Sequence, residues 1–564
     1  MTSLCTKHVL CCAMLLFGGL LTTAEGQQWA VDDWNWTESI STIPYDKGGH
    51  HLYLGKFEDR LYYRGGSDDQ PTLEVYDWSK EHLFSINVSF VVNEKTLSFD
   101  RLIETRTGLI GTFKWADRDN SRLEVYTATL SEDAFAEPSL LLSHDYLRVI
   151  GIFKNAYPLS ETHIFRRSTC HDYFISSDDL SYHLYSNGLA PIGYSNKVNQ
   201  EIEGRYFALF DANFEIIREW TIPTSPEYKI SSLALSSTGE IYFRGIKAMK
   251  FLERNEALAG KKGPSYYLYF GTISEQGYTV LPLGLADGHQ ATNYKLELDG
   301  ASGRFAIFGF YTDGTTKGNM SGLFVVRGEG GSIVKTTEST LPNGFENSEV
   351  LMHKSKMDGM VQVIRGERIA DIPFYSTGLQ LKSRAQGADE TVSLVFEFDN
   401  ASTQRNYRTV SSAGGSYSVS SGTSLIHDVG ALFFVTIDRD DRLMNVNYFN
   451  KLYHTGGWKA GRSMIWHDAD YVYAYYMTTR SRKEIKNLDG AHEFGEMFEF
   501  GKWDHQGGFV EWEILTSGIK DFETIPKPLI REGQEVLFES FNLRYSVYTK
   551  LEPSSFRLAT RIAH

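Results

Sequence analysis

The feature of this chain that most constrains its fold is a repeated hairpin pattern. The sequence Phe-Gly-Thr-Ile-Ser-Glu-Gln-Gly at residues 270–277 returns as Phe-Gly-Lys-Trp-Asp-His-Gln-Gly at residues 500–507, and apolar residues alternate on both sides of each copy. Alternation with a period of two is typical of strands, and glycine between two such runs is typical of a turn. We therefore expect a β-hairpin that recurs along the chain, in a protein built from several small sheets.

A second repeated pattern precedes these hairpins. Gly239 and Gly245 flank one apolar run, and Gly303 and Gly309 flank another with the same spacing. The first glycine of each pair suits a turn that needs a positive φ, and the second suits a strand end or the close approach of another backbone. Each pattern, joined to the hairpin that follows it, forms a unit of four strands.

Four-stranded units of this kind can be placed along most of the chain. They fall at residues 44–93, 96–142, 146–224, 229–289, 293–341, 347–455 and 460–517. The whole pattern resembles the β-propeller superfamily, whose blades are four-stranded antiparallel sheets. The resemblance implies an all-β fold with a single propeller over residues 44–552 and about seven blades, with six and eight as alternatives. The sequence lacks the signatures of the named propeller repeats, so the resemblance assigns no functional residues.

The end of the chain supplies two further strand patterns, at residues 535–539 and 544–549. A closed ring of blades needs its last segment to pair with the first blade, since this pairing hides the only free strand edges. We therefore expect these C-terminal strands to pair with the first blade.

Three segments are expected outside the ring of blades. Residues 27–43 form an N-terminal extension that contains Trp29, Trp34 and Trp36, and residues 553–564 form a C-terminal tail. Residues 400–423 are rich in Ser, Thr and Gly and contain too few apolar residues for a buried face. They are interpreted as a polar surface insertion within the propeller.

The N-terminus resembles a secretory signal peptide. Lys7 precedes an apolar run over residues 9–21, and small residues precede Gln27, which predicts a signal peptide at residues 1–26. The apolar run is too short to cross a bilayer, and no later segment comes closer. We expect a secreted protein, extracellular or periplasmic, without a membrane span. Only Cys170 remains after cleavage, so the core must hold the fold without an internal disulfide.

Composition limits the classes of partner. The 564 residues are 41% hydrophobic, enough for a large interior, and the formal net charge is -15. Binding to nucleic acid or to an anionic membrane depends on clustered Lys and Arg, and the chain has no basic block. We expect neither partner.

The search for catalytic motifs favours no reaction. Gly-x-Ser-x-Gly, His-Glu-x-x-His and paired cysteines are all absent after residue 26. The catalytic residues are therefore unassigned, and no metal or cofactor is expected. The densest group of candidate side chains comprises His163, His171, His183, Asp172, Asp178 and Asp179. Alternate positions in a strand could bring some of them to one point, but the spacing matches no known ligand pattern and ordinary strand residues explain it better.

Two acidic turns have a similar double interpretation. Asp438, Asp440 and Asp441 could offer oxygen ligands to calcium, but the arginines interleaved with them favour a charged hairpin turn. Asp468 and Asp470, which follow His467, are also explained by a turn between two strands. The pair of histidines at residues 50–51 is equally ambiguous.

Four Asn-x-Ser/Thr sequons occur, at Asn35, Asn87, Asn319 and Asn400. This number is close to chance for a chain of this length, and the sequons matter only in a eukaryotic source.

Two functions from different classes remain. The first is a secreted, non-catalytic binding or scaffold protein that holds a protein or carbohydrate ligand at the loops of the channel mouth. The alternative is a carbohydrate-active hydrolase or lyase whose carboxylates meet at the same place. The absence of catalytic motifs favours binding. Acidic or His side chains from different blades that converge in one pocket would favour the enzyme.

Overall fold

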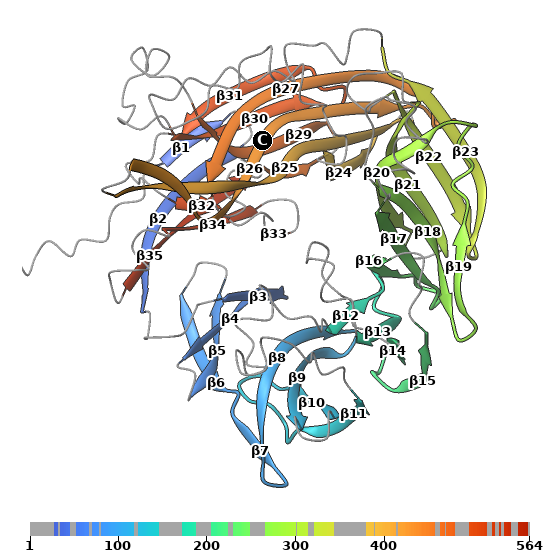
Figure 1. Ribbon diagram of the computed structural model, residues 1–564. Helices are drawn as coiled ribbons and strands as arrows, with labels where there is room; N and C mark the ends of the chain where they lie inside the picture. Colours follow the sequence, from blue (N-terminus) through green and yellow to red (C-terminus); the bar gives the residue numbers. More distant parts are fainter. Residues whose placement is uncertain are drawn as a thin grey trace, which may run out of the picture. The chain divides into compact units, whose positions relative to one another are not determined.

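The computed structural model consists of β-strands and the turns between them (Figure 1). It describes residues 28–31, 34–44, 52–66, 70–77, 81–117, 122–145, 172–187, 205–223, 229–248, 266–299, 302–313, 321–342, 379–387, 390–412, 415–456, 463–468, 470–479, 496–515, 522–524, 529–531, 535–542 and 551–561. The all-β class is confirmed. None of the described residues forms a helix with the length and apolar character needed to cross a bilayer.

Seven sheets follow the seven predicted units in order, and their strands are consecutive in the chain. Sheets 1 to 3 consist of β3 (Leu52–Phe57), β4 (Arg60–Gly66), β5 (Pro71–Asp77) and β6 (His82–Asn87); of β7 (Phe90–Val92), β8 (Lys95–Thr105), β9 (Gly108–Asp117), β10 (Arg122–Leu130) and β11 (Ser139–Asp145); and of β12 (Asp172–Ser176), β13 (Tyr182–Asn187), β14 (Arg205–Asp211) and β15 (Ile216–Ile222). Sheets 4 and 5 consist of β16 (Lys229–Leu235), β17 (Ile241–Ala248), β18 (Tyr266–Ser274) and β19 (Gly277–Leu281); and of β20 (Gln290–Leu298), β21 (Arg304–Thr312), β22 (Gly322–Glu329) and β23 (Ser332–Thr340). Sheets 6 and 7 consist of β24 (Leu379–Gln386), β25 (Val392–Ser412), β26 (Gly415–Ile437) and β27 (Leu443–Gly456); and of β28 (Met464–His467), β29 (Tyr471–Thr479), β30 (Glu496–Asp504) and β31 (Phe509–Leu515). The expected four-stranded antiparallel sheets are confirmed, and sheet 2 has β7 as a fifth strand.

The two ends of the chain share one further sheet. It contains β1 (Gln28–Val31), β2 (Trp34–Pro44), β32 (Phe522–Thr524), β33 (Leu529–Arg531), β34 (Glu535–Asn542) and β35 (Leu551–Arg561). β35 pairs with β2 over its whole length, from Trp34 opposite Arg561 to Pro44 opposite Leu551.

This pairing differs from the predicted one. The C-terminal strands were expected to pair with residues 44–93, whereas β34 pairs with β35, and β35 with a strand inside the expected N-terminal extension. The physical reason is visible in β2, where Trp34, Trp36 and Ile40 alternate with small polar residues as in any strand. The expected strand at residues 544–549 lies outside the described residues.

Packing divides the chain into two compact units. The larger unit comprises Asp46–Ala401 and Gly430–Asn450, and it contains sheets 1 to 5 with the adjoining part of sheet 6. The smaller unit comprises Met1–Tyr45, Ser402–Val429 and Lys451–His564, and it contains sheet 7 and the sheet of the two chain ends.

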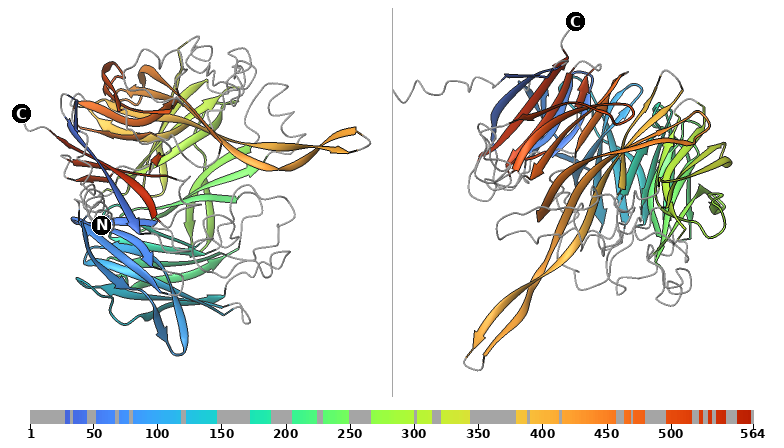
Figure 2. Two further views of the ribbon diagram at one scale, coloured as in Figure 1. Left: turned by 90° about the vertical axis from the view of Figure 1, so that its left-hand side faces the viewer. Right: turned by 90° about the horizontal axis from the view of Figure 1, so that it is seen from above.

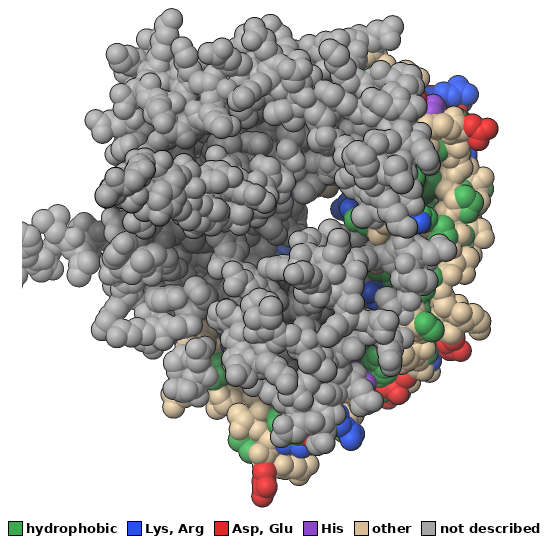
Figure 3. Space-filling model, viewed as in Figure 1, with side chains coloured by type: hydrophobic (Ala, Val, Ile, Leu, Met, Phe, Trp, Pro, Cys, Tyr) green, Lys and Arg blue, Asp and Glu red, His purple; other side chains and the backbone are tan. Residues whose placement is uncertain are grey.

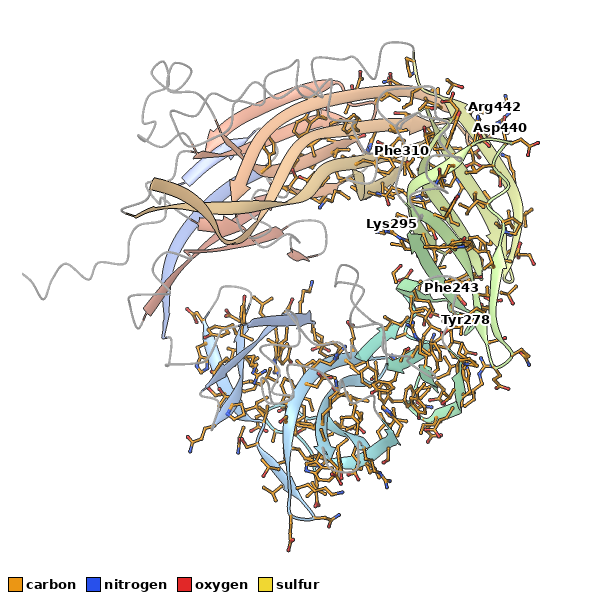
Figure 4. The ribbon with its side chains drawn as sticks, viewed as in Figure 1. Phe243, Tyr278, Lys295, Phe310, Asp440 and Arg442 are labelled. Atoms are coloured by element: carbon orange, nitrogen blue, oxygen red, sulfur yellow. The ribbon has the colours of Figure 1, made fainter. Side chains whose placement is uncertain are left out.

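The core of the larger unit is a series of apolar layers between consecutive sheets. One layer lies between each successive pair from sheets 1 and 2 to sheets 5 and 6. In β21, Phe305 and Ile307 pack toward sheet 4, while Phe308 and Phe310 pack toward sheet 6. Phe310 is labelled in Figure 4. Because both faces of the strand are buried, both sets of alternate residues are apolar. Burial of each such side chain contributes roughly 1.5–3 kcal/mol.

Several hairpins share one turn geometry. Oδ1 of Asp211 accepts the N–H groups of Asn213 and Glu215, each at 2.9 Å. Oδ1 of Asp438 accepts those of Asp440 at 2.9 Å and Arg442 at 2.8 Å. An aspartate side chain that accepts backbone N–H groups in this way stabilises a tight turn between two strands.

The two glycines of a pair in the second repeated pattern are required for different physical reasons. Gly303 has a φ of +67°, as a turn position with positive φ requires. Gly309 lies inside β21, and a Cβ there would come within 2.5 Å of both the Asn293 carbonyl oxygen and the Phe324 ring. Both expectations for the Gly303 and Gly309 pair are confirmed.

The segment expected as a polar insertion, residues 400–423, belongs to two long strands. β25 and β26 have 21 and 23 residues and are neighbours in sheet 6, so the segment continues this hairpin (orange in Figure 2). Alternating Ser, Thr and Tyr supply the β propensity that a purely polar interpretation overlooked.

Candidate functional site

The first strands of neighbouring sheets, with β8 in the place of the short β7 in sheet 2, define an inner edge of the larger unit. β3 lies against β8, β12 against β16, and β20 against β24. Within sheet 5, Lys295 projects at the side of β20, opposite to β23 (Figure 4). We call this side of the larger unit the inner edge, and the turns that follow the first strands the inner turns.

The inner turns of sheets 2 to 5 lie next to one another. Arg106, in the turn of sheet 2, donates to the Asp179 backbone oxygen at 3.0 Å and to the Asp179 carboxylate at 3.2 Å. Gly239 of sheet 4 lies against the Tyr182 ring, and Gly303 of sheet 5 lies against Thr238. The inner turns of sheets 2, 3, 4 and 5 therefore lie in one continuous row.

A pair of carboxyl groups from different sheets approaches this row. Partial burial, followed by the negative charges of Glu297 and Asp179, raises the pKa of Asp178. Glu297 accepts an ion pair from Lys295 at 3.2 Å. Asp178 belongs to sheet 3 and Glu297 to sheet 5, so the fold brings together charges that are far apart in sequence. We call Asp178, Lys295 and Glu297 the inner charge cluster.

The members of the predicted His and Asp group that the structure describes are not brought to one point. His183 is fully buried, with Nδ1 2.8 Å from the Ser176 hydroxyl oxygen and its ring 5.2 Å from that of Phe214. Burial lowers the pKa of His183 to about 4, so the imidazole is neutral at pH 7. Asp179 is held instead by Arg106 and by the turn. His163 and His171 lie outside the described residues, as do residues 50–51, and Asp172 begins β12.

The second acidic candidate is a charged hairpin turn. The Asp438 carboxylate is occupied by backbone N–H groups, and the Asp441 carboxylate accepts Nε of Arg327 at 3.0 Å and Nζ of Lys335 at 3.2 Å. Asp440 and Arg442 lie at the outer end of the turn (Figure 4). These contacts use the oxygens that calcium would need. No group of three or more His, Cys, Asp or Glu suited to a metal ion occurs in the ranges the structure describes.

The third candidate, around His467, is also a turn. Asp468 accepts the N–H groups of Asp470 at 2.9 Å and Tyr471 at 2.8 Å, and it accepts the Tyr473 hydroxyl at 2.9 Å. Burial and then the nearby His505 lower the pKa of His467.

One cluster of polar side chains was missed by sequence reasoning. Glu74, in β5, binds Nε2 of His82 at 2.8 Å and the Ser85 hydroxyl at 2.5 Å. These hydrogen bonds, with one from Thr72, outweigh burial and lower the pKa of Glu74. Ser85 and Glu74 both approach the same nitrogen of His82, whereas a catalytic triad uses the two opposite nitrogens. Sequence reasoning could have found this cluster only from the pairing of β5 with β6, which places Glu74 opposite Ser85.

The first strands carry bulges that direct polar groups into the sheet. In β8 the register shifts between Phe99 and Arg101, so Asp100 is the inserted residue. Its carboxylate binds Nζ of Lys114 at 2.9 Å and Nε of Arg101 at 2.8 Å. Burial alone would raise the pKa of Asp100, but these two charges outweigh it and lower the pKa to about 2. The bulge holds a structural ion pair.

Charges of both signs are interspersed on the described surface (Figure 3).

Comparison with known proteins finds only solved structures of low similarity. No family model and no curated protein matches the chain. The β-propeller domain of the Trilobed protease from Pyrococcus furiosus is 9% identical with a TM-score of 0.30, over 81% of this chain and 95% of that chain. The polysaccharide lyase Uly1 is 8% identical with a TM-score of 0.29, over 96% and 95% of the two chains. Virginiamycin B lyase from Staphylococcus aureus is 9% identical with a TM-score of 0.29, over 93% and 100%.

The consecutive four-stranded antiparallel sheets, with an apolar layer between each pair in the larger unit, are typical of propeller blades. The resemblance of the chain to the β-propeller superfamily rests on these sheets.

Proposed function

We propose that this protein is a secreted, non-catalytic binding protein that recognises a protein or carbohydrate ligand at the inner turns. The observation that carries the proposal is the set of charged side chains that sheets 2, 3 and 5 place along the inner edge. Arg106 and Lys295 are each about half exposed, at 51% and 53% of the side chain. Exposed, orientable charges next to rigid strands are suited to recognition of a polar ligand.

Three ionisable groups outside the inner charge cluster support a binding function, because their contacts stabilise the fold. Asp100 is bound by two cations, Asp441 is bound by Arg327 and Lys335, and His183 is neutral and buried in the core. A general acid or base must instead reach the reacting atoms of a substrate.

A specific observation favours the alternative, a carbohydrate-active hydrolase or lyase. Asp178 and Glu297 come from different sheets, and the pKa of Asp178 is raised while Glu297 is ion-paired with Lys295. Two carboxyl groups in unequal environments are the arrangement that glycosidases use, one as acid and one as base or nucleophile.

One pair of variants separates the two functions. The wild-type chain and Asp178→Asn/Glu297→Gln are screened on an array of glycans and extracellular protein fragments, and every bound glycan is then incubated and analysed for cleavage. A binding protein leaves the glycan intact, and the double variant alters its affinity. Cleavage by the wild type that the double variant loses establishes the enzyme. Glu275→Gln, a control in the outer turn between β18 and β19 whose carboxylate is 51% exposed and lies 3.6 Å from Arg218, should behave as wild type.

Export is part of the proposal and rests on Lys7 with the apolar run over residues 9–21. The N-terminal sequence of protein recovered from culture medium or periplasm should begin at Gln27. A chain that stays inside the cell with residues 1–26 intact would contradict it.

A further inference from the structure

We infer that Asn87 is an acceptor for an N-linked glycan at the outer strand of sheet 1. This inference rests on the proposed export, since the modifying enzyme acts only on chains that enter the eukaryotic secretory pathway. Asn87, Val88 and Ser89 form the sequon. It is the sequon whose asparagine side chain the structure describes.

The three residues of the sequon have very different exposures. Asn87 and Ser89 are exposed, whereas Val88 between them is fully buried and packs in the apolar layer between sheets 1 and 2. The Val88 N–H also donates to the Pro71 carbonyl at 3.3 Å. Val88 therefore anchors the backbone, and the residues on either side are presented to solvent.

The amide group of Asn87 is held in one orientation. Its Oδ1 accepts the backbone N–H of Ser89 at 2.9 Å, which closes a local turn. Its Nδ2, the atom that would form the bond to the sugar, makes no hydrogen bond to the described residues. The reaction would join Nδ2 to the anomeric carbon of a lipid-linked oligosaccharide, with loss of the Nδ2 proton and release of the lipid diphosphate. The side chain needs no rearrangement of the sheet to carry the product.

The position also gives the glycan a physical role. Asn87 ends β6, which is the edge strand of sheet 1. Leu83, the residue inserted at the bulge of β6 four positions before Asn87, is 45% exposed. An open edge strand with an exposed apolar residue is prone to pair with another chain. A glycan at the end of β6 would obstruct that pairing.

The test uses the full chain expressed in a eukaryotic secretory cell. Protein from the medium is treated with peptide-N-glycosidase F in heavy-oxygen water, and the peptide that contains residue 87 is analysed by mass spectrometry. We expect Asn87 to be converted to labelled aspartate in most molecules. Ser89→Thr should keep this occupancy, and the matched variant Ser89→Ala should lose it, because the acceptor motif requires a hydroxyl group.

A second expression separates the inference from its premise. The chain from Gln27 is placed behind a signal peptide of the host, so entry into the pathway no longer depends on residues 1–26. If only the native N-terminus fails to export, the export proposal is wrong while Asn87 is still tested. A secreted wild type that melts in one transition and carries unmodified Asn87 in both expressions would overturn the inference.

Discussion

The turn after β14 in sheet 3 and the turn after β26 in sheet 6 have the same backbone and opposite chemistry. In each, an aspartate accepts two backbone N–H groups, and the residue three positions later has a positive φ, 65° at Phe214 and 68° at Asp441. Both of those residues are buried, at 6% and 4% exposure. Phe214 stacks on Phe210 at 4.8 Å, whereas Asp441 binds Arg327 and Lys335.

The difference separates the role of the aspartate from the role of the residue three positions later. The first aspartate sets the backbone of a three-residue loop that ends in a left-handed position. The left-handed residue, which glycine fills at Gly507 in sheet 7, reaches the neighbouring sheet in both of the other turns. The side chain at this left-handed position therefore determines whether the two sheets are joined by apolar packing or by an ion pair. An acidic residue at this position is explained by the contact between the sheets, without a role as a metal ligand.

The largest expected effect is at the apolar turn. Phe214→Ala should lower the free energy of unfolding by about 3–5 kcal/mol, because it leaves a cavity between sheets 2 and 3 and keeps the unfavourable φ. Chemical denaturation measures the loss. Asn213→Ala, which changes an exposed neighbour in the same turn, should stay within about 0.5 kcal/mol of wild type. If Phe214→Ala lowered the free energy of unfolding by less than Asp441→Ala does, the proposed difference between the two turns would be wrong.

Substitution in the charged turn should lower the free energy of unfolding by less than Phe214→Ala does. Asp441→Ala leaves Arg327 and Lys335 without their shared carboxylate, but these side chains are 34% and 45% exposed and can be hydrated. We expect a loss of about 2–3 kcal/mol, below that for a fully buried pair. Asp440→Ala is the matched control, since its backbone oxygen and not its side chain receives Lys335. In a double-mutant cycle with Arg327→Ala, no coupling would refute the ion pair.

Asp100 extends the comparison to a charge buried inside one sheet. The pKa of Asp100 is lowered from 3.8 to about 2 in the folded state, so its ionised form stabilises the fold at any pH above about 4. This contribution, about 2 kcal/mol, is lost as the pH falls from 4 to 2. Unfolding measured across this range should show a weaker pH dependence in Asp100→Asn. An equal slope in both proteins would show that other carboxyl groups dominate.

The sequence predicted the local part of this architecture. Alternating runs located the sheets, and the residues around Asp438 predicted a charged hairpin turn, because both signals depend on residues close together in the chain. The pairing of β2 with β35 was missed, since no local pattern states which distant strand completes a sheet. It depends on a contact between the two ends of the chain.

The same limit applies to the candidate site. Asp438, Asp440 and Asp441 are close together in sequence, so a calcium site could be considered from the sequence alone. Arg327, which binds Asp441, lies in another sheet and could not be predicted as its partner. The inner charge cluster was only half anticipated. Asp178 was a candidate, whereas Lys295 and Glu297 resemble ordinary residues of an exposed strand until sheets 3 and 5 are placed in one unit. A bulge such as the one at Asp100 has no sequence signature of its own.

The smallest effect tests what the two turns share. Asp211→Ala and Asp438→Ala should each cost about 1 kcal/mol, because each removes two hydrogen bonds to backbone groups that water can then reach. The two losses should agree closely, although the residues three positions later differ completely. Asn at either position keeps a side-chain oxygen acceptor and should recover most of the stability. Unequal losses in denaturant titrations would mean that the left-handed residue, and not the aspartate, determines the turn, and the division of roles between these two positions would fail.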